Sequence, residues 1–497
     1  MDTSLENSRD AKWRVDLRDR RPVKERTSIP RVVMPMLPAE FRVTNNDEVN
    51  EGLSPEQASI EARRCLDCAD PQCVNGCPVG IDIPGFIKRI EAGDPLGAAD
   101  VIKLTSTLPA VCGRVCPQEK QCESKCIYNR MKKQPVAIGY LERYAADTQL
   151  ADLKSHPGDR AFTLPEPLNI RVAVVGSGPA GLSFAGSMAA KGYDVTLFEA
   201  LHEIGGVLKY GIPEFRLPNS VVDAEIEALR ARGVTFVKDC VIGKTLSYED
   251  LRAQGFQGIF VASGAGLPRF MGIPGENFIG VMSSNEYLTR INLMGAGRPG
   301  EDTPVLKGHR VAVIGGGNTA MDSVRTALRQ GAETAMIVYR RSEDEMPARI
   351  EEIAHAKEEG VRFLTLHNPV EYLADEFGRV RAMKLQKMEL GEPDASGRRS
   401  PVPVEGAIEE VPVDLVIVSI GVSPNPLIPN AISSLAVSRR GTIEVDPETM
   451  RSNLSDLYAG GDIVRGGATV ILAMGDGRRA AEHMHAALYG PQKTSRL

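Results

Sequence analysis

The 497-residue sequence has no long hydrophobic run and no excess of positive charge. No apolar run approaches the roughly 18 residues that a membrane-spanning helix requires. The N-terminal region mixes basic and acidic residues and lacks the apolar segment of a signal peptide. Lys and Arg number 59 against 65 Asp and Glu, and this net charge of -6 gives no electrostatic basis for binding nucleic acid. We therefore expect a cytoplasmic protein with neither a membrane nor a nucleic acid as partner.

Cysteine is nearly absent from most of the chain, because eight of the nine cysteines lie between residues 65 and 126 and only Cys240 lies outside. A chain without a signal peptide is not expected to contain structural disulfides. A cluster of thiols this dense therefore indicates metal ligation.

The spacing of the cysteines distinguishes zinc from iron–sulfur clusters, the two kinds of metal site that could use eight thiolates. The runs read C-x₂-C-x₄-C-x₃-C-P, ending at Pro78, and C-x₃-C-P-x₄-C-x₃-C, which includes Pro117. Zinc ribbons usually carry paired C-x₂-C knuckles, and only one such pair is present. Because cysteine followed by proline is typical of ferredoxins, the spacing predicts two [4Fe-4S] clusters in a helical domain over residues 51-155.

Each run is expected to lend one ligand to the cluster of the other run, because three closely spaced thiolates occupy three corners of a cube. The expected ligands are Cys65, Cys68, Cys73 and Cys126 for one cluster, and Cys77, Cys116 and Cys122 for the other. The eighth ligand is open between Cys112 and Glu142, which lies on a helix predicted over residues 137-148.

The residues that precede the cysteines favour a short helix and an extended arm. Ser54-Pro55-Glu56-Gln57 combines an N-cap serine, a first-turn proline and a capping-box glutamine, which predicts a helix that ends near Cys65. Residues 1-50 contain scattered prolines and many charges and are expected to form an extended arm instead of a core. Two interpretations of this segment stay open: a flexible tail and an arm that binds a partner.

A first dinucleotide fingerprint follows the predicted strand 170-175. Its glycines are Gly176, Gly178 and Gly181, in the order G-x-G-x-x-G. The next predicted strand, 194-198, ends at Glu199, where a carboxylate suits a free ribose 2′-hydroxyl. Strand, spacing and acid together predict a nucleotide site with the phosphates at a helix N-terminus.

A second fingerprint follows the predicted strand 310-314. It reads Gly315-Gly316-Gly317-Asn318-Thr319-Ala320, with alanine in place of the third glycine. The strand 335-339 ends at Arg340 and Arg341, and two guanidiniums at the ribose position suit a 2′-phosphate. This site is expected to bind NADPH.

Two sites with different ribose preferences suggest a flavin and a nicotinamide. The segment Leu457 to Asp462, which includes Gly461, is similar to the flavoprotein segment whose aspartate binds the ribityl chain or pyrophosphate. A helix is expected to start at Thr469 and to place its N-terminus toward the flavin. Disulfide reductase chemistry is excluded, because Cys240 has no cysteine partner near it. Hydride transfer needs alignment more than an acid or a base, so no general base is named.

With these motifs assembled, the chain resembles the flavoproteins in which an NAD(P)H domain is inserted into a discontinuous FAD domain. The resemblance implies an α/β fold: a helical double [4Fe-4S] domain followed by two Rossmann-like dinucleotide-binding domains. The expected boundaries are 167-285 and 420-490 for the FAD domain and 286-419 for the NADPH domain.

The whole set of motifs is similar to the small-subunit family of bacterial NADPH-dependent glutamate synthase. Further matching segments are Pro38 to Arg42, Gly205-Gly206 to Pro213, Tyr339 to Arg341 and Met346 to Ala348. The resemblance implies that the chain carries FAD, with Gly206 at its site, oxidises NADPH, and passes electrons to an FMN-containing large subunit that forms L-glutamate from L-glutamine and 2-oxoglutarate. Residues 1-50 and the exposed edge of the cluster domain would form the docking surface.

Two other functions stay open at this point. One is the NADPH-oxidising subunit of a dihydropyrimidine dehydrogenase or a related oxidoreductase; in that relative a side-chain amide oxygen, at the position of Glu142, completes one cluster. The other is a structural or sensory module in which zinc occupies the cysteines. Flavin absorption by the purified protein would eliminate the second function.

Overall fold

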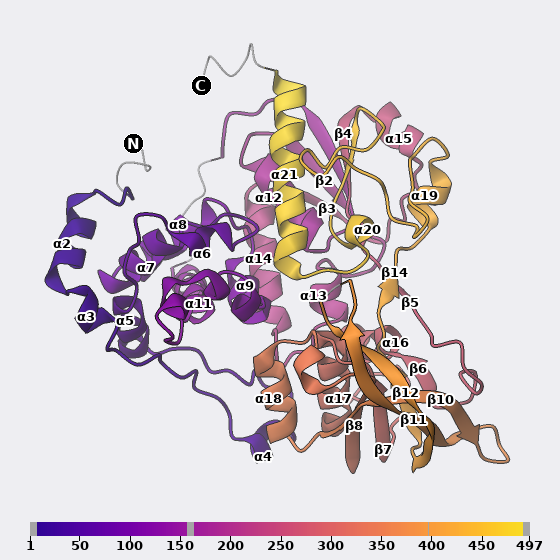
Figure 1. Ribbon diagram of the computed structural model, residues 1–497. Helices are drawn as coiled ribbons and strands as arrows, with labels where there is room; N and C mark the ends of the chain where they lie inside the picture. Colours follow the sequence, from indigo (N-terminus) through magenta and orange to yellow (C-terminus); the bar gives the residue numbers. More distant parts are fainter. Residues whose placement is uncertain (1–6, 157–163, 396, 491–497) are drawn as a thin grey trace.

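The computed structural model describes residues 7–156, 164–395 and 397–490. Figure 1 shows a helical part at the left, a parallel-sheet module at the upper right, and a second parallel-sheet module at the lower right. The long helix α21 (Val470–Tyr489) lies between the helical part and the upper module. This arrangement agrees with the predicted fold class of one helical domain and two α/β modules.

The helical part consists of short helices joined by tight turns. Its elements are α2 (Lys12–Arg20), α3 (Val23–Arg26), α4 (Ala39–Arg42), α5 (Pro55–Arg63), α6 (Gln72–Asn75), α7 (Ile83–Glu91), α8 (Pro95–Lys103), α9 (Pro109–Val115), η1 (Gln118–Lys120), η2 (Glu123–Lys125), α10 (Ile127–Arg130) and α11 (Ile138–Ser155). The predicted capping box of α5 is confirmed: Ser54 accepts from the Gln57 N–H, and the Gln57 side chain accepts from the Ser54 N–H. Because α5 then ends at Arg63, Cys65 follows directly after the helix.

The first module is a parallel five-stranded sheet in the order β15-β4-β1-β2-β3. Its strands are β1 (Arg171–Val175), β2 (Asp194–Phe198), β3 (Thr235–Val237), β4 (Phe256–Val261) and β15 (Leu457–Ala459). The helices of this module are α12 (Pro179–Ala189), α13 (Val207–Tyr210), α14 (Asn219–Ala231), α15 (Tyr248–Ala253), α19 (Leu427–Ala431), α20 (Asp462–Arg465) and α21. Cys240 lies just after β3, which ends at Val237, and its side chain is buried.

The second module is a parallel sheet in the order β6-β13-β7-β8-β9, and its chain segment lies between β4 and β15. The strands are β6 (Val281–Ser283), β7 (Arg310–Ile314), β8 (Thr334–Tyr339), β9 (Arg362–Thr365) and β13 (Leu415–Val418), and the helices are α16 (Ser284–Leu288), η3 (Thr289–Leu293), α17 (Asn318–Arg329), η4 (Glu343–Glu345) and α18 (Ile350–Glu358). Since β6 pairs with β13, residues 281-283 belong to this sheet, and the domain boundary expected at residue 285 falls too late in the chain.

An antiparallel three-stranded sheet, which sequence reasoning missed, extends from the second module. It consists of β10 (His367–Ala374), β11 (Val380–Pro393) and β12 (Arg399–Pro412), paired in that order. Its residues do not follow the regular alternation of apolar and polar side chains that marks a half-buried strand.

The two modules are joined by a pair of crossover segments. After β4 the chain forms β5 (Leu267–Pro268), and after β13 it forms β14 (Val422–Ser423); these two short strands pair antiparallel. Within the described residues, no buried apolar cluster contains side chains from both the first sheet and the second sheet. One apolar cluster does join the helical part to the first module.

The expectation that residues 1-50 form an extended arm outside the core is wrong for the part of the arm that the structure describes, which begins at Asn7. The arm folds into α2, α3 and α4; its buried Arg14 and Arg26 contact the helical part, and its buried Arg42 contacts α18 of the second module. Arg14 and Arg18 form ion pairs with the fully buried Asp67 at 2.7 and 2.6 Å. The arm therefore adds buried ion pairs to the few apolar side chains that it buries, Leu17, Met34 and Val49.

Arg26 makes the densest of these contacts. Its guanidinium forms an ion pair with Glu91 at 2.9 Å and donates to the carbonyl oxygens of Arg63 and Leu17.

In the parts of the chain that the structure describes, no helix is both long and apolar enough to cross a bilayer.

We expect Arg26→Met to release the arm. The substitution removes hydrogen bonds from a buried charged donor, each worth about 1.5–3 kcal/mol, so the arm should be cleaved by trypsin at least about tenfold faster. The control is Arg21→Met in the same arm, because Arg21 pairs only with Glu25 and both side chains are at least 35% exposed. Equal cleavage rates for the two variants would contradict this account of the arm.

Candidate functional site

A single cleft of about 1720 Å³ receives both glycine fingerprints. Its volume exceeds the roughly 300–1,000 Å³ of an ordinary small-molecule pocket, as expected for a site that holds more than one dinucleotide. Every predicted cofactor residue lines the cleft except Gly181. The lining set is Gly176, Gly178, Glu199, Gly206, Gly315, Gly317, Asn318, Thr319, Arg340, Arg341, Gly461, Asp462 and Thr469.

The first fingerprint has the shape that a pyrophosphate requires. Gly176 has φ +103°, and a Cβ there would lie 2.5 Å from the Ala262 carbonyl oxygen. A Cβ on Gly178 would meet nothing within 4 Å, so the backbone at this position is open to the cleft. Gly181 instead serves packing, because a Cβ would lie 2.0 Å from the Gly176 carbonyl oxygen and would push α12 off the sheet.

Glu199 is held rigidly at the end of β2. One carboxylate oxygen accepts from the Ser177 N–H at 2.8 Å and from its hydroxyl at 2.5 Å, and the other accepts from the Leu201 N–H at 2.9 Å. The side chain is 6% exposed and lines the cleft. These contacts fix the acceptor where the fingerprint predicts a ribose.

The second fingerprint repeats this geometry. Gly315 has φ +142° with a would-be Cβ 2.2 Å from the Ser419 carbonyl oxygen, whereas Gly317 is open. Ala320, at the third position, is fully buried and fits because its side chain is small. The Asn318 side-chain oxygen accepts from the Arg349 N–H at 2.9 Å, which ties the start of α17 to the segment before α18.

Arg340 and Arg341 both line the cleft but differ in their surroundings. Arg341 is buried, forms an ion pair with Asp394 at 2.6 Å and donates to the Arg399 carbonyl oxygen at 2.8 Å. Arg340 is exposed and is the arginine whose guanidinium can turn toward a ligand. Arg398, in the turn between β11 and β12, also lines the cleft and was missed, because this hairpin is distant in sequence from the fingerprint.

The predicted flavin segment meets the cleft from the C-terminal side. Asp462 accepts from the Ala468 N–H at 3.0 Å, and burial raises the pKa of its carboxyl group. The predicted helix start is confirmed, since Thr469 caps α21 and accepts from the Leu472 N–H. The positive end of a 20-residue helix therefore points at the cleft.

The first predicted cluster set comes together in space. Burial raises the pKa of Cys73, and the next causes are the neighbouring thiols of Cys65, Cys126 and Cys68. Burial likewise raises the pKa of Cys65 to about 11. Thiols gathered in an apolar site resist ionisation unless a cationic group compensates them, and an iron–sulfur core would do so.

The second set comes together beside the cleft. Burial raises the pKa of the Cys77 and Cys122 thiols; the next cause that raises it is Glu142 for Cys77, and Glu123 and then Glu142 for Cys122. Burial raises the pKa of Glu142 to about 8, and Glu142 Oε1 is buried with no hydrogen-bond partner. The Cys112 thiol lies 3.4 Å from Met474 Sδ on α21, and its hydrogen bond to Cys116, followed by burial, raises its pKa.

All nine cysteines are free thiols. Among the described residues, no group of three or more His, Cys, Asp or Glu side chains is arranged to hold a metal ion. A [4Fe-4S] core is a cube, so its four thiolates are spread more widely than the ligands of one ion. The grouping of the two sets suits a cluster, and the assignment of individual ligands stays a prediction.

Two family models cover most of the chain. The pyridine nucleotide-disulphide oxidoreductase model matches residues 170–487, and the model of dihydropyrimidine dehydrogenase domain II with its 4Fe-4S cluster matches residues 42–153. The chain is 37% identical to the glutamate synthase [NADPH] small chain of Azospirillum brasilense, over 90% of this chain and 93% of that one. The chain belongs to the glutamate synthase small-chain family. The Escherichia coli small chain is 35% identical over 91% of this chain and 96% of that one.

Other relatives of this small-chain family member are longer proteins. The chain is 36% identical to the NADPH-Fe(3+) oxidoreductase subunit beta of Geobacter sulfurreducens, but it covers only 64% of that protein. The solved structure of Mycobacterium tuberculosis FprA in complex with NADPH aligns over 66% of this chain and 86% of that one, with a TM-score of 0.55 and 21% identity. That likeness shows a shared fold of the two dinucleotide modules.

We predict that Glu142, and not Cys112, completes the second cluster, because the Glu142 oxygen has no partner whereas the Cys112 thiol already contacts Met474 and Cys116. In the assembled complex, Glu142→Ala should lose about half of the iron, one cluster of two. Cys112→Ala and the control Cys240→Ala should retain all of it. Iron and acid-labile sulfide per chain measure the result, and iron loss in Cys112→Ala alone would refute the prediction.

Proposed function

We propose that this chain is the electron-input subunit of a glutamate synthase: it oxidises NADPH and delivers the electrons to a large subunit. The observation that carries the proposal is the single cleft, into which a fingerprint ending in Glu199 and a fingerprint ending in Arg340 both open. A buried cysteine set adjoins the same cleft, since Val115 and Pro117, on either side of Cys116, line it. Two nucleotides and a redox centre can therefore meet in one place.

The residues of the chain bind and orient the two nucleotides. When bound, NADPH supplies a hydride, FAD accepts it, and iron–sulfur clusters accept electrons one at a time. The open backbones at Gly178 and Gly317 accommodate the pyrophosphates, and Glu199 and Arg340 distinguish a free ribose from a phosphorylated one. The N-terminus of α21 would stabilise negative charge on a reduced flavin.

The position of the two cysteine sets suggests their order. The set of Cys77, Cys116 and Cys122 adjoins the cleft, since Val115 and Pro117 beside Cys116 line it, and Cys116 and Cys122 are buried. In the other set, Cys68, Cys73 and Cys126 are partly exposed, and Cys68 lies near Arg9 of the N-terminal arm. The first set is then the one that serves the flavin, and the second is the one that faces a partner. The partner we propose is the FMN-containing large subunit that forms L-glutamate from L-glutamine and 2-oxoglutarate.

We propose that residues 1-50 form part of the docking surface. Deleting residues 1-37 would remove Arg14 and Arg26, which contact Asp67 and Glu91 beside the cysteine run. Such a deletion would therefore disturb the helical part as well as the arm. Substitutions of exposed arm residues, such as Val33 at 77% exposure, probe docking without that loss.

Arg340→Ala should weaken NADPH binding much more than NADH binding. Losing a charge-assisted contact to the 2′-phosphate costs about 1.5–3 kcal/mol, which corresponds to at least about tenfold in the dissociation constant. Titration of each nucleotide into the flavin-loaded protein measures the two constants. The control is Arg381→Ala, because Arg381 is 54% exposed and pairs with Glu410 on the antiparallel sheet. An unchanged ratio of NADPH to NADH affinity would contradict the prediction that Arg340 binds the 2′-phosphate.

The purified chain should reduce artificial electron acceptors with NADPH but should form no glutamate by itself. Nothing resembling a glutaminase nucleophile is recognisable in its sequence, since the one cysteine outside the cluster runs, Cys240, is internal. Adding a glutamate synthase large subunit should restore NADPH-dependent glutamate formation, measured as glutamate released per NADPH oxidised. The proposal is wrong if the chain alone converts glutamine and 2-oxoglutarate, or if the large subunit gains nothing from it.

A further inference from the structure

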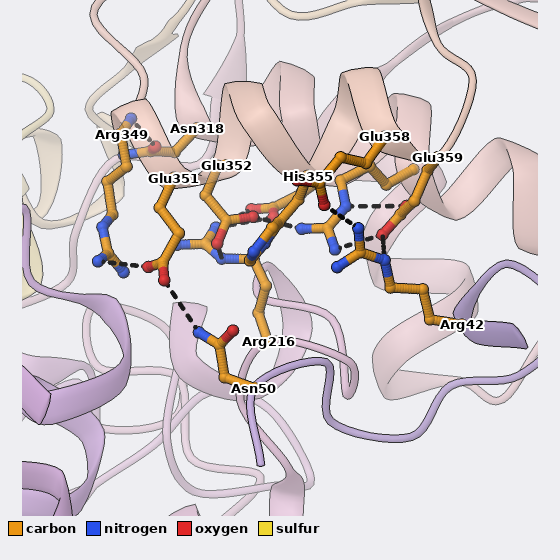
Figure 2. A network of polar contacts seen from close by, with 12 residues as sticks. Arg42, Asn50, Arg216, Asn318, Arg349, Glu351, Glu352, His355, Glu358 and Glu359 are labelled. Atoms are coloured by element: carbon orange, nitrogen blue, oxygen red, sulfur yellow. Dashed lines mark hydrogen bonds and ion pairs between the residues drawn. The ribbon is translucent and has the colours of Figure 1, made fainter. Parts of the chain in front are cut away.

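The boundary between the two dinucleotide modules is held by buried charges. Figure 2 shows arginines and acids that converge on α18 from the N-terminal arm, from the first module and from α17. Arg42 comes from the arm, and Arg216 comes from the loop between α13 and α14 of the first module. The acids they meet, Asp322, Glu352 and Glu359, all belong to the second module.

Arg216 makes the contact that crosses between the modules. Its Nη1 donates to both carboxylate oxygens of Asp322 at 2.7 and 2.8 Å, and its Nε lies 3.3 Å from Glu352. Arg216 and Asp322 are 8% and 3% exposed, and both line the cleft. The contact is therefore largely buried, directional and part of the cleft wall.

The neighbouring Phe215 extends the same contact. Its ring lies under the guanidiniums of Arg325 and Arg329, both on α17, at 4.6 and 3.9 Å. Arg325 forms a further ion pair with Glu359 at 2.7 Å. The pair Phe215–Arg216 is thus inserted between α17 and α18, as a two-residue plug from the first module.

This plug is one of several contacts between the modules. Another is the hinge, the pairing of β5 with β14, which involves only two residues on each strand. The Asn292 side chain also donates to the Tyr210 carbonyl oxygen, and Arg298 lies 3.9 Å from Glu214. Figure 1 shows β5 and β14 between the two modules and α18 at the left edge of the second module. Since no apolar cluster of the described residues spans both sheets, these contacts set the angle between the modules, and the Arg216–Asp322 pair is the shortest and most buried ion pair among them.

The angle matters because α17 begins at the second fingerprint. Asp322 lies one turn after Asn318, so a contact that fixes Asp322 also fixes the helix N-terminus at the nucleotide phosphates. Buried ion pairs add little net stability compared with apolar packing, but they specify one geometry. Hydride transfer is sensitive to that geometry, since a misplacement of about 1 Å can cost about a hundredfold in rate.

We propose that Arg216 is a positioning residue for hydride transfer: through Asp322 it holds α17, and with it the bound NADPH, in register with the flavin of the first module. The proposal rests on the proposed function of the cleft. It assigns to Arg216 no contact with the reacting atoms. Its effect is therefore expected on the rate of flavin reduction and not on nucleotide affinity.

The test is anaerobic stopped-flow reduction of the flavin at saturating NADPH, with the complete complex. Arg216→Met should slow flavin reduction by about ten- to hundredfold, while the NADPH dissociation constant changes by less than about threefold. Arg216→Lys, which keeps the charge beside Asp322, should recover part of the rate. With NADPH deuterated at the transferred position, the isotope effect on the slowed reduction should rise, because hydride transfer then limits the rate.

The matched control is Arg230→Met, because Arg230 is 51% exposed and its side-chain contacts, with Glu227 on α14 and the Phe236 ring on β3, lie within the first module. Partial misfolding lowers the fraction of flavin that is reduced but leaves the rate of its reduction unchanged. A wild-type rate of flavin reduction in Arg216→Met would therefore overturn the proposal, even if less flavin is reduced. If Arg216→Met does not retain flavin, Arg216→Lys and Asp322→Asn decide, and wild-type rates in both overturn it. A wild-type complex whose flavin NADPH does not reduce would refute the proposed function instead.

Discussion

A cleft that must admit two dinucleotides cannot be closed by a shared apolar core, and the rest of this structure follows from that constraint. The two parallel sheets keep separate cores, and their boundary includes the β5–β14 hinge, the cleft and a set of buried ion pairs around α18. Several of the largest fully buried side chains of the protein are arginines, among them Arg42 and Arg325 of this boundary. Charge here replaces apolar packing as the means of fixing orientation.

The boundary between the helical part and the first module is built differently. One apolar cluster runs through both, from Phe86 and Ile102 of the helical part to Phe184 and Met474 of the module. Close packing resists displacement, so it fixes the distance between the cysteine set near Cys116 and the N-terminal end of α21. Rigid apolar contact suits a redox relay of constant spacing, whereas a polar boundary suits a cleft that binds and releases a nucleotide.

The same use of charge explains the N-terminal arm. Its composition, rich in arginine and proline, is typical of an exposed segment, yet the Arg14 and Arg26 side chains are almost completely buried. Each pairs with an acid of the helical part, Asp67 between Cys65 and Cys68 and Glu91 at the end of α7. A buried charge is tolerated only when it is paired, and these pairs can form only when the helical part has already folded.

The sequence by itself determined what depends on neighbouring residues. The capping box at Ser54, the N-cap at Thr469, the strands before both fingerprints and the open glycines all follow from local backbone chemistry, and the structure contains each of them. The cysteine runs likewise specify their metal chemistry through spacing alone. Such features can be predicted because a turn, a cap or a ligand run is complete within about ten residues.

Only the tertiary structure decided which charges meet. Arg341 pairs with Asp394 and leaves Arg340 to face the cleft, and Arg216 finds Asp322 from 106 positions away. The antiparallel sheet and the pairing of β6 with β13 were equally invisible to local patterns. The sequence gives the charge of a side chain but not its partner. Pairing between residues so far apart depends on how the modules pack, and that packing is a property of the whole chain.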